Sequence, residues 1–172
     1  MERLALLGFS LDEVGRHGVP TIQVLDRLDR AFDVEAVTKD FFEDYKHVFF
    51  NLQADLAKQS GDAQWAHDYA LQLLNRLMFL YFVQRKGWLG NRTDFLRHLW
   101  FSYRRAERPA DTFYSQWLSP LFFEAFNNRF QAGRADLAYL PADIRRALQT
   151  APYLNGGLFA RNLLDEAHPV HL

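Results

Sequence analysis

Residues 69–83 form a long, mainly apolar segment with the sequence YALQLLNRLMFLYFV. As a helix it is apolar on nearly every face, and such a helix is normally the buried central element of a domain. Asp62 can cap the start of this helix, and Gly87 stands where a left-handed residue ends one. The sequence therefore predicts a central helix over residues 62–86. The side chains expected to be largely buried in it are Leu73, Leu74, Leu77 and Leu80.

Two amphipathic helices are expected before this central one. Pro20 suits the first turn of a short helix over about residues 20–31. Asp33 is a capping residue, and apolar side chains follow it at steps of three and four as far as Gly61. The second helix is therefore the most regular amphipathic element of the chain.

Three further helices are expected after the central one. The first starts at Asn91 or Thr93 and must end before Pro109, and the second starts at Asp111. Pro120 either kinks this second helix or begins a new one that Ser119 caps. A loop over residues 131–138 and a short helix over 141–148 follow. The side chains predicted to point inward are Phe95, Leu96, Leu99, Trp100, Tyr103, Phe113, Trp117, Leu121, Phe122, Ala125 and Phe126.

The fold class that these patterns predict is all-α. No alternating strand pattern longer than four residues is present, so we expect an irregular bundle of about five to six helices around residues 62–86. The predicted organisation is an N-terminal segment over residues 1–19, a helical domain over 20–160 and a C-terminal tail over 161–172. We expect this tail to lead toward a domain that is absent from the chain.

Composition excludes several classes of protein. The 172 residues include no cysteine, which rules out disulfide frameworks and thiolate metal sites. The longest apolar run, Leu77 to Val83, is far shorter than the ~20 residues of a membrane helix. We therefore expect a cytoplasmic protein without a membrane partner.

Basic charge is concentrated in one segment. Residues 76–108 hold 8 Lys and Arg against 2 Asp and Glu, whereas residues 1–75 have a net charge of -6. Arg97, Arg104 and Arg108 form one stripe of a helix opposite Leu99 and Tyr103, and such a stripe can follow a phosphate backbone. The candidate DNA-phosphate contacts are Arg76, Arg85, Lys86, Arg92, Arg97, Arg104, Arg105 and Arg108.

A plainer interpretation of the same charges stays open. The arginines can be solvated, or they can pair with the acidic first half of the chain. The net charge of the whole chain, -1, agrees with that interpretation, because domains that bind nucleic acid usually carry a clear positive excess.

Motifs for catalysis, cofactor binding and metal binding are missing. The six histidines are scattered, and Pro169 keeps His168 and His171 from the helical spacing of a metal pair. Phosphate-binding glycine loops and the G-x-S-x-G hydrolase motif are absent. We assign no catalytic, cofactor-binding or metal-binding residue. The C-terminal turn instead indicates an exposed docking surface between domains, with Tyr153, Asn155, Gly156, Gly157, Leu158 and Phe159.

Four strings carry a resemblance to a known family. They are FDVEAVTKDFF (32–42), LNRLMFLYFVQRKGWL (74–89), LSPLFFEAFN (118–127) and PYLNGGLF (152–159). Over about residues 28–160 the chain resembles large bacterial restriction-modification methylases, the type IIG-like enzymes that include BREX-associated adenine-specific methylases.

The resemblance implies a role in a larger enzyme of phage defence. The corresponding stretch of the family is a helical connector between an N-terminal portion, often a nuclease, and a methyltransferase domain. The parent enzyme would methylate adenine in DNA with S-adenosylmethionine. The family's N-P-P-[YF] and glycine-rich methyl-donor motifs are absent here, as is a PD-(D/E)xK nuclease motif, so we expect this chain to have no activity or cofactor of its own. The implied partners are DNA, bound weakly and without sequence preference, and a neighbouring methyltransferase domain or chain.

Two other functions remain open at this point. The 16 Phe, 7 Tyr and 4 Trp exceed what an average core needs, so they can also serve a free-standing protein-interaction module. Alternatively, they can line the pocket of a small helical ligand-binding protein.

Overall fold

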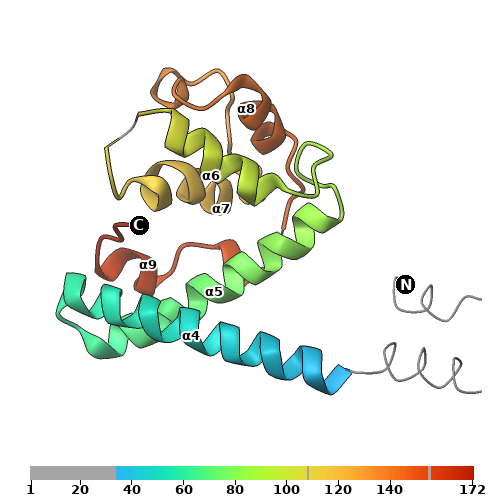
Figure 1. Cartoon of the computed structure of the whole chain (residues 1–172). Helices are drawn as coiled ribbons and strands as arrows, with labels where there is room; N and C mark the ends of the chain where they lie inside the picture. Colours follow the sequence, from blue (N-terminus) through green and yellow to red (C-terminus); the bar gives the residue numbers. More distant parts are fainter. Residues whose placement is uncertain (1–33, 108, 155) are drawn as a thin grey trace, which may run out of the picture. The chain divides into compact units, whose positions relative to one another are not determined.

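The computed structural model describes residues 34–107, 109–154 and 156–172. Within these ranges the chain forms helices and no β-strand, which confirms the predicted all-α fold (Figure 1). The α-helices are α4 (Val34–Ser60), α5 (Ala63–Arg85), α6 (Phe95–Arg105), α7 (Ser119–Phe123), α8 (Ala142–Gln149) and α9 (Leu163–Ala167). The shorter turns are the π-helical η1 (Tyr114–Leu118) and the 3₁₀ turns η2 (Ala125–Asn127), η3 (Ala135–Leu137) and η4 (Gly157–Phe159). The helix expected over 20–31 and the cap Asp33 lie outside the described residues.

The chain divides into two compact units, residues 1–48 and 49–172, and the boundary falls inside α4. In the first unit, α4 exposes the aromatic side chains of Phe41 and Phe42. The second unit holds α5 to α9, and from Phe49 onward α4 belongs to it. There the ring of Phe49 meets His67 of α5 edge-on, with centroids 5.2 Å apart, and Leu56 is fully buried.

The ends of α5 are fixed by the residues that the sequence indicated. The Asp62 carboxylate accepts a hydrogen bond of 2.9 Å from the backbone N–H of Trp65, which satisfies one of the free donors of the first turn. Gly87 has a φ of +73° beyond the other end, a conformation in which a side chain is strained. The predicted central helix over 62–86 is therefore confirmed to within one residue at each end.

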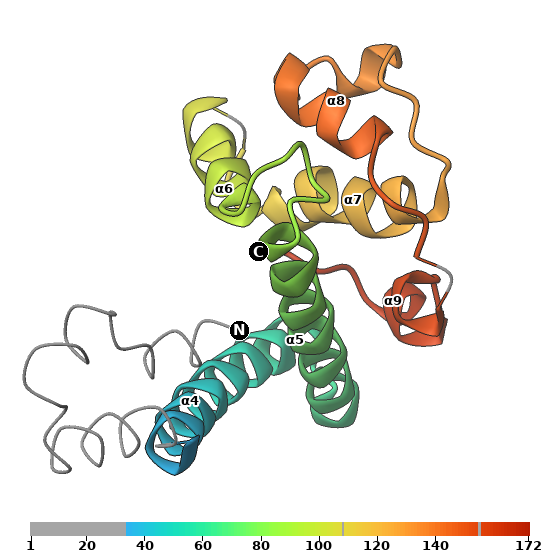
Figure 2. The ribbon, with the colours of Figure 1, turned by 90° about the vertical axis from the view of Figure 1, so that its right-hand side faces the viewer.

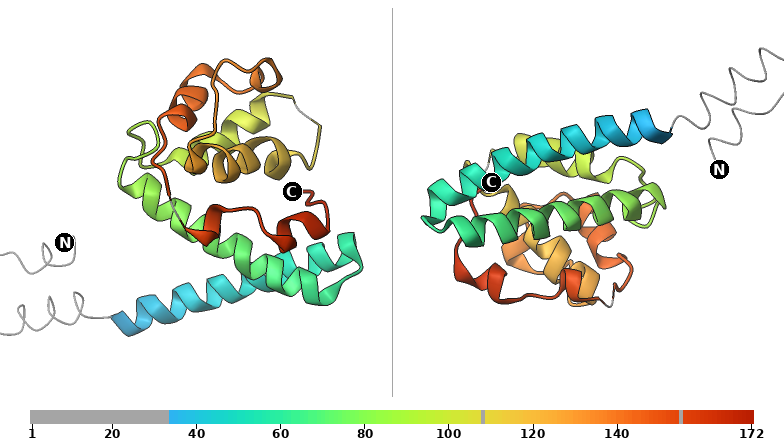
Figure 3. Two further views of the ribbon diagram at one scale, coloured as in Figure 1. Left: turned by 180° about the vertical axis from the view of Figure 1, so that it is seen from behind. Right: turned by 90° about the horizontal axis from the view of Figure 1, so that it is seen from below.

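Only one face of α5 is buried, and this corrects the expectation of burial on nearly every side. Helices α6, α7, α8 and α9 all lie on one side of α5 (Figures 1 and 3). Leu73, Leu74 and Leu80 are buried there as predicted, whereas Leu77 is only partly buried. The outer apolar face of α5 is exposed and consists of Leu71, Met78, Phe79, Tyr81 and Phe82.

Aromatic side chains form much of the core between α5 and the helices that follow. Trp117 of η1 and Phe122 of α7 are fully buried, and so is Phe126 of η2. The helix does not restart at Pro120, because η1 runs into α7 without a break and Leu118 and Ser119 both have helical φ and ψ. Pro120 lies in the first turn of α7, directly after the π-helical turn, so the alternative of a proline within one continuing, distorted helix applies. Ser119 is the first residue of that helix and forms no side-chain cap, which differs from its predicted role.

The last twelve residues, expected as a tail, pack against other elements within the second unit. Asn162 caps α9 and forms a capping box with Asp165. The side chain of Val170 is buried, and the carbonyl of Leu172 accepts a hydrogen bond of 2.9 Å from the Phe113 N–H. Figure 2 shows α9 beside α5. These contacts bring the end of the chain back beside the start of η1.

Candidate nucleic-acid interface

The side chains of the basic segment, residues 76–108, differ in burial. Arg76 of α5 has no exposed surface and forms two hydrogen bonds of 2.6 and 2.9 Å with the Asp165 carboxylate. Its Nε also donates to the Leu158 carbonyl, 2.7 Å away. An arginine that is buried in this way cannot reach a phosphate, so Arg76 leaves the candidate set.

A buried pair of tyrosines lies next to this arginine in the core. The hydroxyl of Tyr69 donates a hydrogen bond to that of Tyr114. Burial raises the pKa of both Tyr69 and Tyr114 above its ordinary value, because the charged phenolate would lose its hydration. These hydroxyls therefore stay protonated at neutral pH and form part of the structure rather than of a reactive site.

The basic side chains between the end of α5 and the start of α6 have different neighbours. Arg92 pairs with Asp94 at 3.1 Å, and both side chains are largely exposed. Lys86 places its ammonium 5.5 Å from the centre of the exposed Phe82 ring. Arg85 is exposed at the end of α5. This part of the segment keeps positive charge at the surface.

Helix α6 presents the clearest basic surface. Its exposed side carries Arg97, Trp100, Phe101 and Arg104, whose spacing of three and four residues places them on one helical face. We call these four residues the α6 cation–ring face. The guanidinium of Arg97 lies 5.6 Å from the centre of the Phe101 ring, and that of Arg104 lies 5.8 Å from the Trp100 ring. Arg105 is exposed beside this face, and Arg108 lies outside the described residues.

The opposite side of α6 fixes the orientation of this face. Phe95, Leu99 and Tyr103 are buried at helical spacing, as the sequence predicted. The Leu96 N–H donates to Gln84 Oε1 at 2.9 Å, which satisfies a free donor of the first turn and ties α6 to α5. With these contacts in place, α6 cannot turn its arginines inward.

The prediction that Trp100 points inward from α6 is wrong. Its side chain is 41% exposed, although the helical spacing predicted that it would lie with the core residues. Its ring meets Phe113 edge-on with centroids 5.0 Å apart, so it is held at the boundary of the core rather than inside it. The signal that could have identified it is its spacing from Arg97 and Arg104, which is three and four residues.

A hydrogen bond also joins α6 to α8. His98 Nε2 lies 2.6 Å from an oxygen of Asp143. Partial burial acts to raise the pKa of Asp143, but the contact with His98 and the backbone N–H of Ile144 outweigh it and lower the pKa. At pH values above the ordinary pKa of a carboxyl group, Asp143 is therefore ionised and this hydrogen bond links α6 to α8.

The alternative of internal pairing with the acidic first half of the chain involves many residues, among them Asp26, Asp29 and Asp33, that lie outside the described ranges. In the described ranges, Arg97, Arg104 and Arg105 form no ion pair with a carboxylate. Arg97 and Arg104 contact rings instead. Within the part of the chain that the structure describes, these two guanidinium groups thus have aromatic rings rather than carboxylates as neighbours.

The C-terminal turn is exposed only in part. Tyr153 is 60% exposed, and Gly156 and Gly157 are open to solvent. Phe159 is buried between Phe126 and Phe122, with ring centroids 4.7 and 5.5 Å away. The expectation that Phe159 belongs to an exposed docking surface is therefore wrong. Leu158 is partly buried, and Asn155 lies outside the described residues.

Two further findings concern the described residues alone. No group of three His, Asp or Glu side chains among them is arranged to hold a metal ion. No helix among them is both long and apolar enough to cross a membrane.

Comparison with known proteins gives one partial match. No protein family model and no solved structure matches the chain. Over 94 residues, 55% of this chain, it is 32% identical to a protein of Methanocaldococcus jannaschii described as "Putative type II restriction enzyme and methyltransferase". The match covers 7% of that protein, so the chain corresponds to a small part of this much larger relative. The sequence is thus related to a restriction-modification protein over about half of its length.

Proposed function

We propose that this chain is a non-catalytic helical connector of a restriction-modification DNA adenine methyltransferase, and that its α6 cation–ring face contacts DNA phosphates. One observation carries the DNA contact: Arg97 and Arg104 are exposed on one helical face and have no carboxylate partner within the described residues. Guanidinium groups arranged in this way bind phosphates by charge and read no base sequence.

The connector role is supported by the partial match and by the outer apolar face of α5. A patch that combines Leu71, Met78 and Phe82 is unusual on the surface of a monomer and is typical of a contact with another domain. The neighbouring methyltransferase domain or chain is the partner that we assign to it. S-adenosylmethionine belongs to that domain, so this chain alone should transfer no labelled methyl group to DNA above a heat-killed control.

The DNA contact is tested by the salt dependence of binding. Fluorescence anisotropy with labelled duplexes of unrelated sequence should give weak affinities that are equal for all sequences and that fall steeply between ~50 and ~200 mM salt. The double variant Arg97→Gln/Arg104→Gln should flatten the slope of log K against log salt by about 0.9 for each lost contact.

A matched control removes the same charge elsewhere. Arg129 and Arg146 are also exposed, and they lie outside α6. Arg129→Gln/Arg146→Gln should leave the salt slope close to that of the unmodified chain. Absence of binding at low salt, or an unchanged slope in the α6 variant, would overturn the DNA contact.

A further inference from the structure

We infer that the α6 cation–ring face binds single-stranded DNA in preference to duplex, with bases stacking on Trp100 and Phe101. This inference rests on the proposed DNA contact and names the form of DNA that the face fits. The face has two components: Arg97 and Arg104 supply positive charge, while Trp100 and Phe101 are 41% and 46% exposed. Rings that alternate with cations along a surface are typical of sites for single-stranded nucleic acid.

The aromatic rings decide between the two forms of DNA. A phosphate contact is available in either form, but the faces of duplex bases are covered by their neighbours in the stack. Only an unpaired base offers a free face to Trp100 or Phe101. Stacking of one base on an aromatic side chain contributes ~1–3 kcal/mol, so two rings are sufficient to produce a preference for single strands.

The neighbours of Trp100 hold its ring in place. Phe113 meets it edge-on at 5.0 Å, and the Tyr103 ring lies 5.6 Å away on the inner side of α6. Tyr103 is itself fixed, because its hydroxyl donates to the Pro109 carbonyl at 3.1 Å. A platform held in this way loses little conformational entropy when a base stacks on it.

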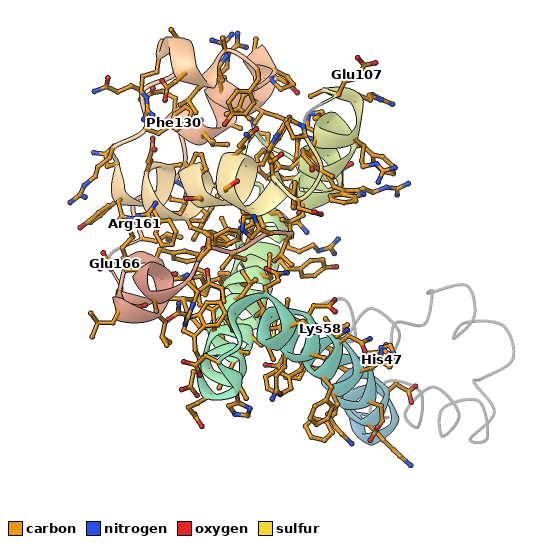
Figure 4. All side chains as sticks on the ribbon, turned by 90° about the vertical axis from the view of Figure 1, so that its left-hand side faces the viewer. His47, Lys58, Glu107, Phe130, Arg161 and Glu166 are labelled. Carbon is orange, nitrogen blue, oxygen red and sulfur yellow. The ribbon has the colours of Figure 1, made fainter. Side chains whose placement is uncertain are left out.

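A hollow beside Trp100 has room for the edge of a base. It measures about 350 Å³ and is lined by side chains that include Tyr103, Arg104, Glu107 and Asp111. Glu107 lies in the turn that follows the C-terminal end of α6 (Figure 4). Its carboxylate and that of Asp111 repel phosphate and can accept hydrogen bonds from base amino groups. The backbone of a bound strand should therefore follow the arginines, with the bases directed toward the hollow.

The face is short, which limits the affinity. Arg97 and Arg104 are seven residues apart, about 10 Å along a helix, a distance that ~3 stacked nucleotides span.

The test compares a labelled oligothymidylate with a duplex of the same number of nucleotides, both bound to the whole chain. The single strand should bind about tenfold more tightly, and Trp100→Ala should remove most of that factor, because it should lower the affinity for the single strand far more than the affinity for the duplex. Phe101→Leu keeps an apolar side chain without an aromatic ring and provides a second variant. Tyr153→Ala removes an exposed ring elsewhere and should change neither affinity.

The outcomes separate this inference from the proposed function. Equal affinity for both forms, or equal loss of both in the Trp100 and Phe101 variants, overturns the preference for single strands but leaves the phosphate contact intact. Failure to bind either form overturns both. Loss of self-association rather than of DNA binding in Trp100→Ala identifies the rings as a contact between copies of the chain, and this also overturns the inference.

Discussion

Arg76 and Arg97 belong to the same basic segment and have opposite environments. Arg76 is fully buried and bonded to Asp165, whereas Arg97 is exposed and lies over the Phe101 ring. A charge count along the chain treats the two alike. Burial, rather than charge, therefore decides whether an arginine stabilises the fold or is exposed at the surface.

The largest effect should follow from breaking the buried pair. Asp165→Ala leaves the Arg76 charge buried without its partner, which should lower the free energy of unfolding by ~3–5 kcal/mol. Urea denaturation followed by circular dichroism measures this loss. Asp55→Ala, which breaks an exposed pair with Lys58, should cost less than ~1 kcal/mol. Similar losses in the two variants would show that Arg76 and Asp165 are not a buried pair.

The two faces of α5 provide the next contrast. Leu80→Ala removes a fully buried side chain and should cost ~2–5 kcal/mol, because it leaves a cavity. Met78→Ala, on the outer apolar face of α5, should cost less than ~1 kcal/mol. Denaturation midpoints of the two variants measure the difference. A Met78 effect as large as that of Leu80 would indicate that this face is covered in solution.

The buried tyrosines predict a third effect, on stability at alkaline pH. The folded state holds the pKa of Tyr69 and Tyr114 above the ordinary value that both have in the unfolded chain. Their contribution is fully present below pH ~10 and is lost as pH rises further, by about 1.4 kcal/mol per pH unit for each tyrosine.

The measurement is urea denaturation at several pH values above neutrality. Tyr114→Phe removes one of the two hydroxyls and should make the alkaline decline less steep. Tyr153→Phe, at an exposed position, should leave the decline as it is. A decline of the same steepness in all three chains would contradict the assignment to the buried pair.

The smallest effect on stability is expected at the surface. Arg97→Gln/Arg104→Gln should change the free energy of unfolding by no more than ~1 kcal/mol, since each residue loses only an exposed contact with a ring. Thermal unfolding of this variant beside the Arg129→Gln/Arg146→Gln control measures it. A large loss would place the two arginines with Arg76 among the residues that hold the fold together.

Local sequence patterns predicted the helical class and both ends of α5, but they placed the starts of the next two helices too early. Asp94, rather than Asn91 or Thr93, precedes α6, and Asp111 has a left-handed φ of +60° before η1. Local causes explain the success at α5: Asp62 accepts from an N–H of the first turn, and Gly87 adopts positive φ. The inner side of α6 was also predictable, because buried residues recur at the helical period in Phe95, Leu99 and Tyr103.

Contacts between distant segments determine which side chains of a nearly all-apolar helix are buried and which of the described arginines are exposed. The periodicity of α5 does not identify its buried face, since apolar residues occur on all sides. The buried face is the one against which α6 to α9 pack. Arg76 and Asp165 are 89 residues apart, so no local pattern links them. Phe159 is buried by Phe122 and Phe126, which approach it only in the folded chain. Burial depends on contacts between distant segments, and for that reason sequence spacing could propose the basic surface but could not separate its buried members from its exposed ones.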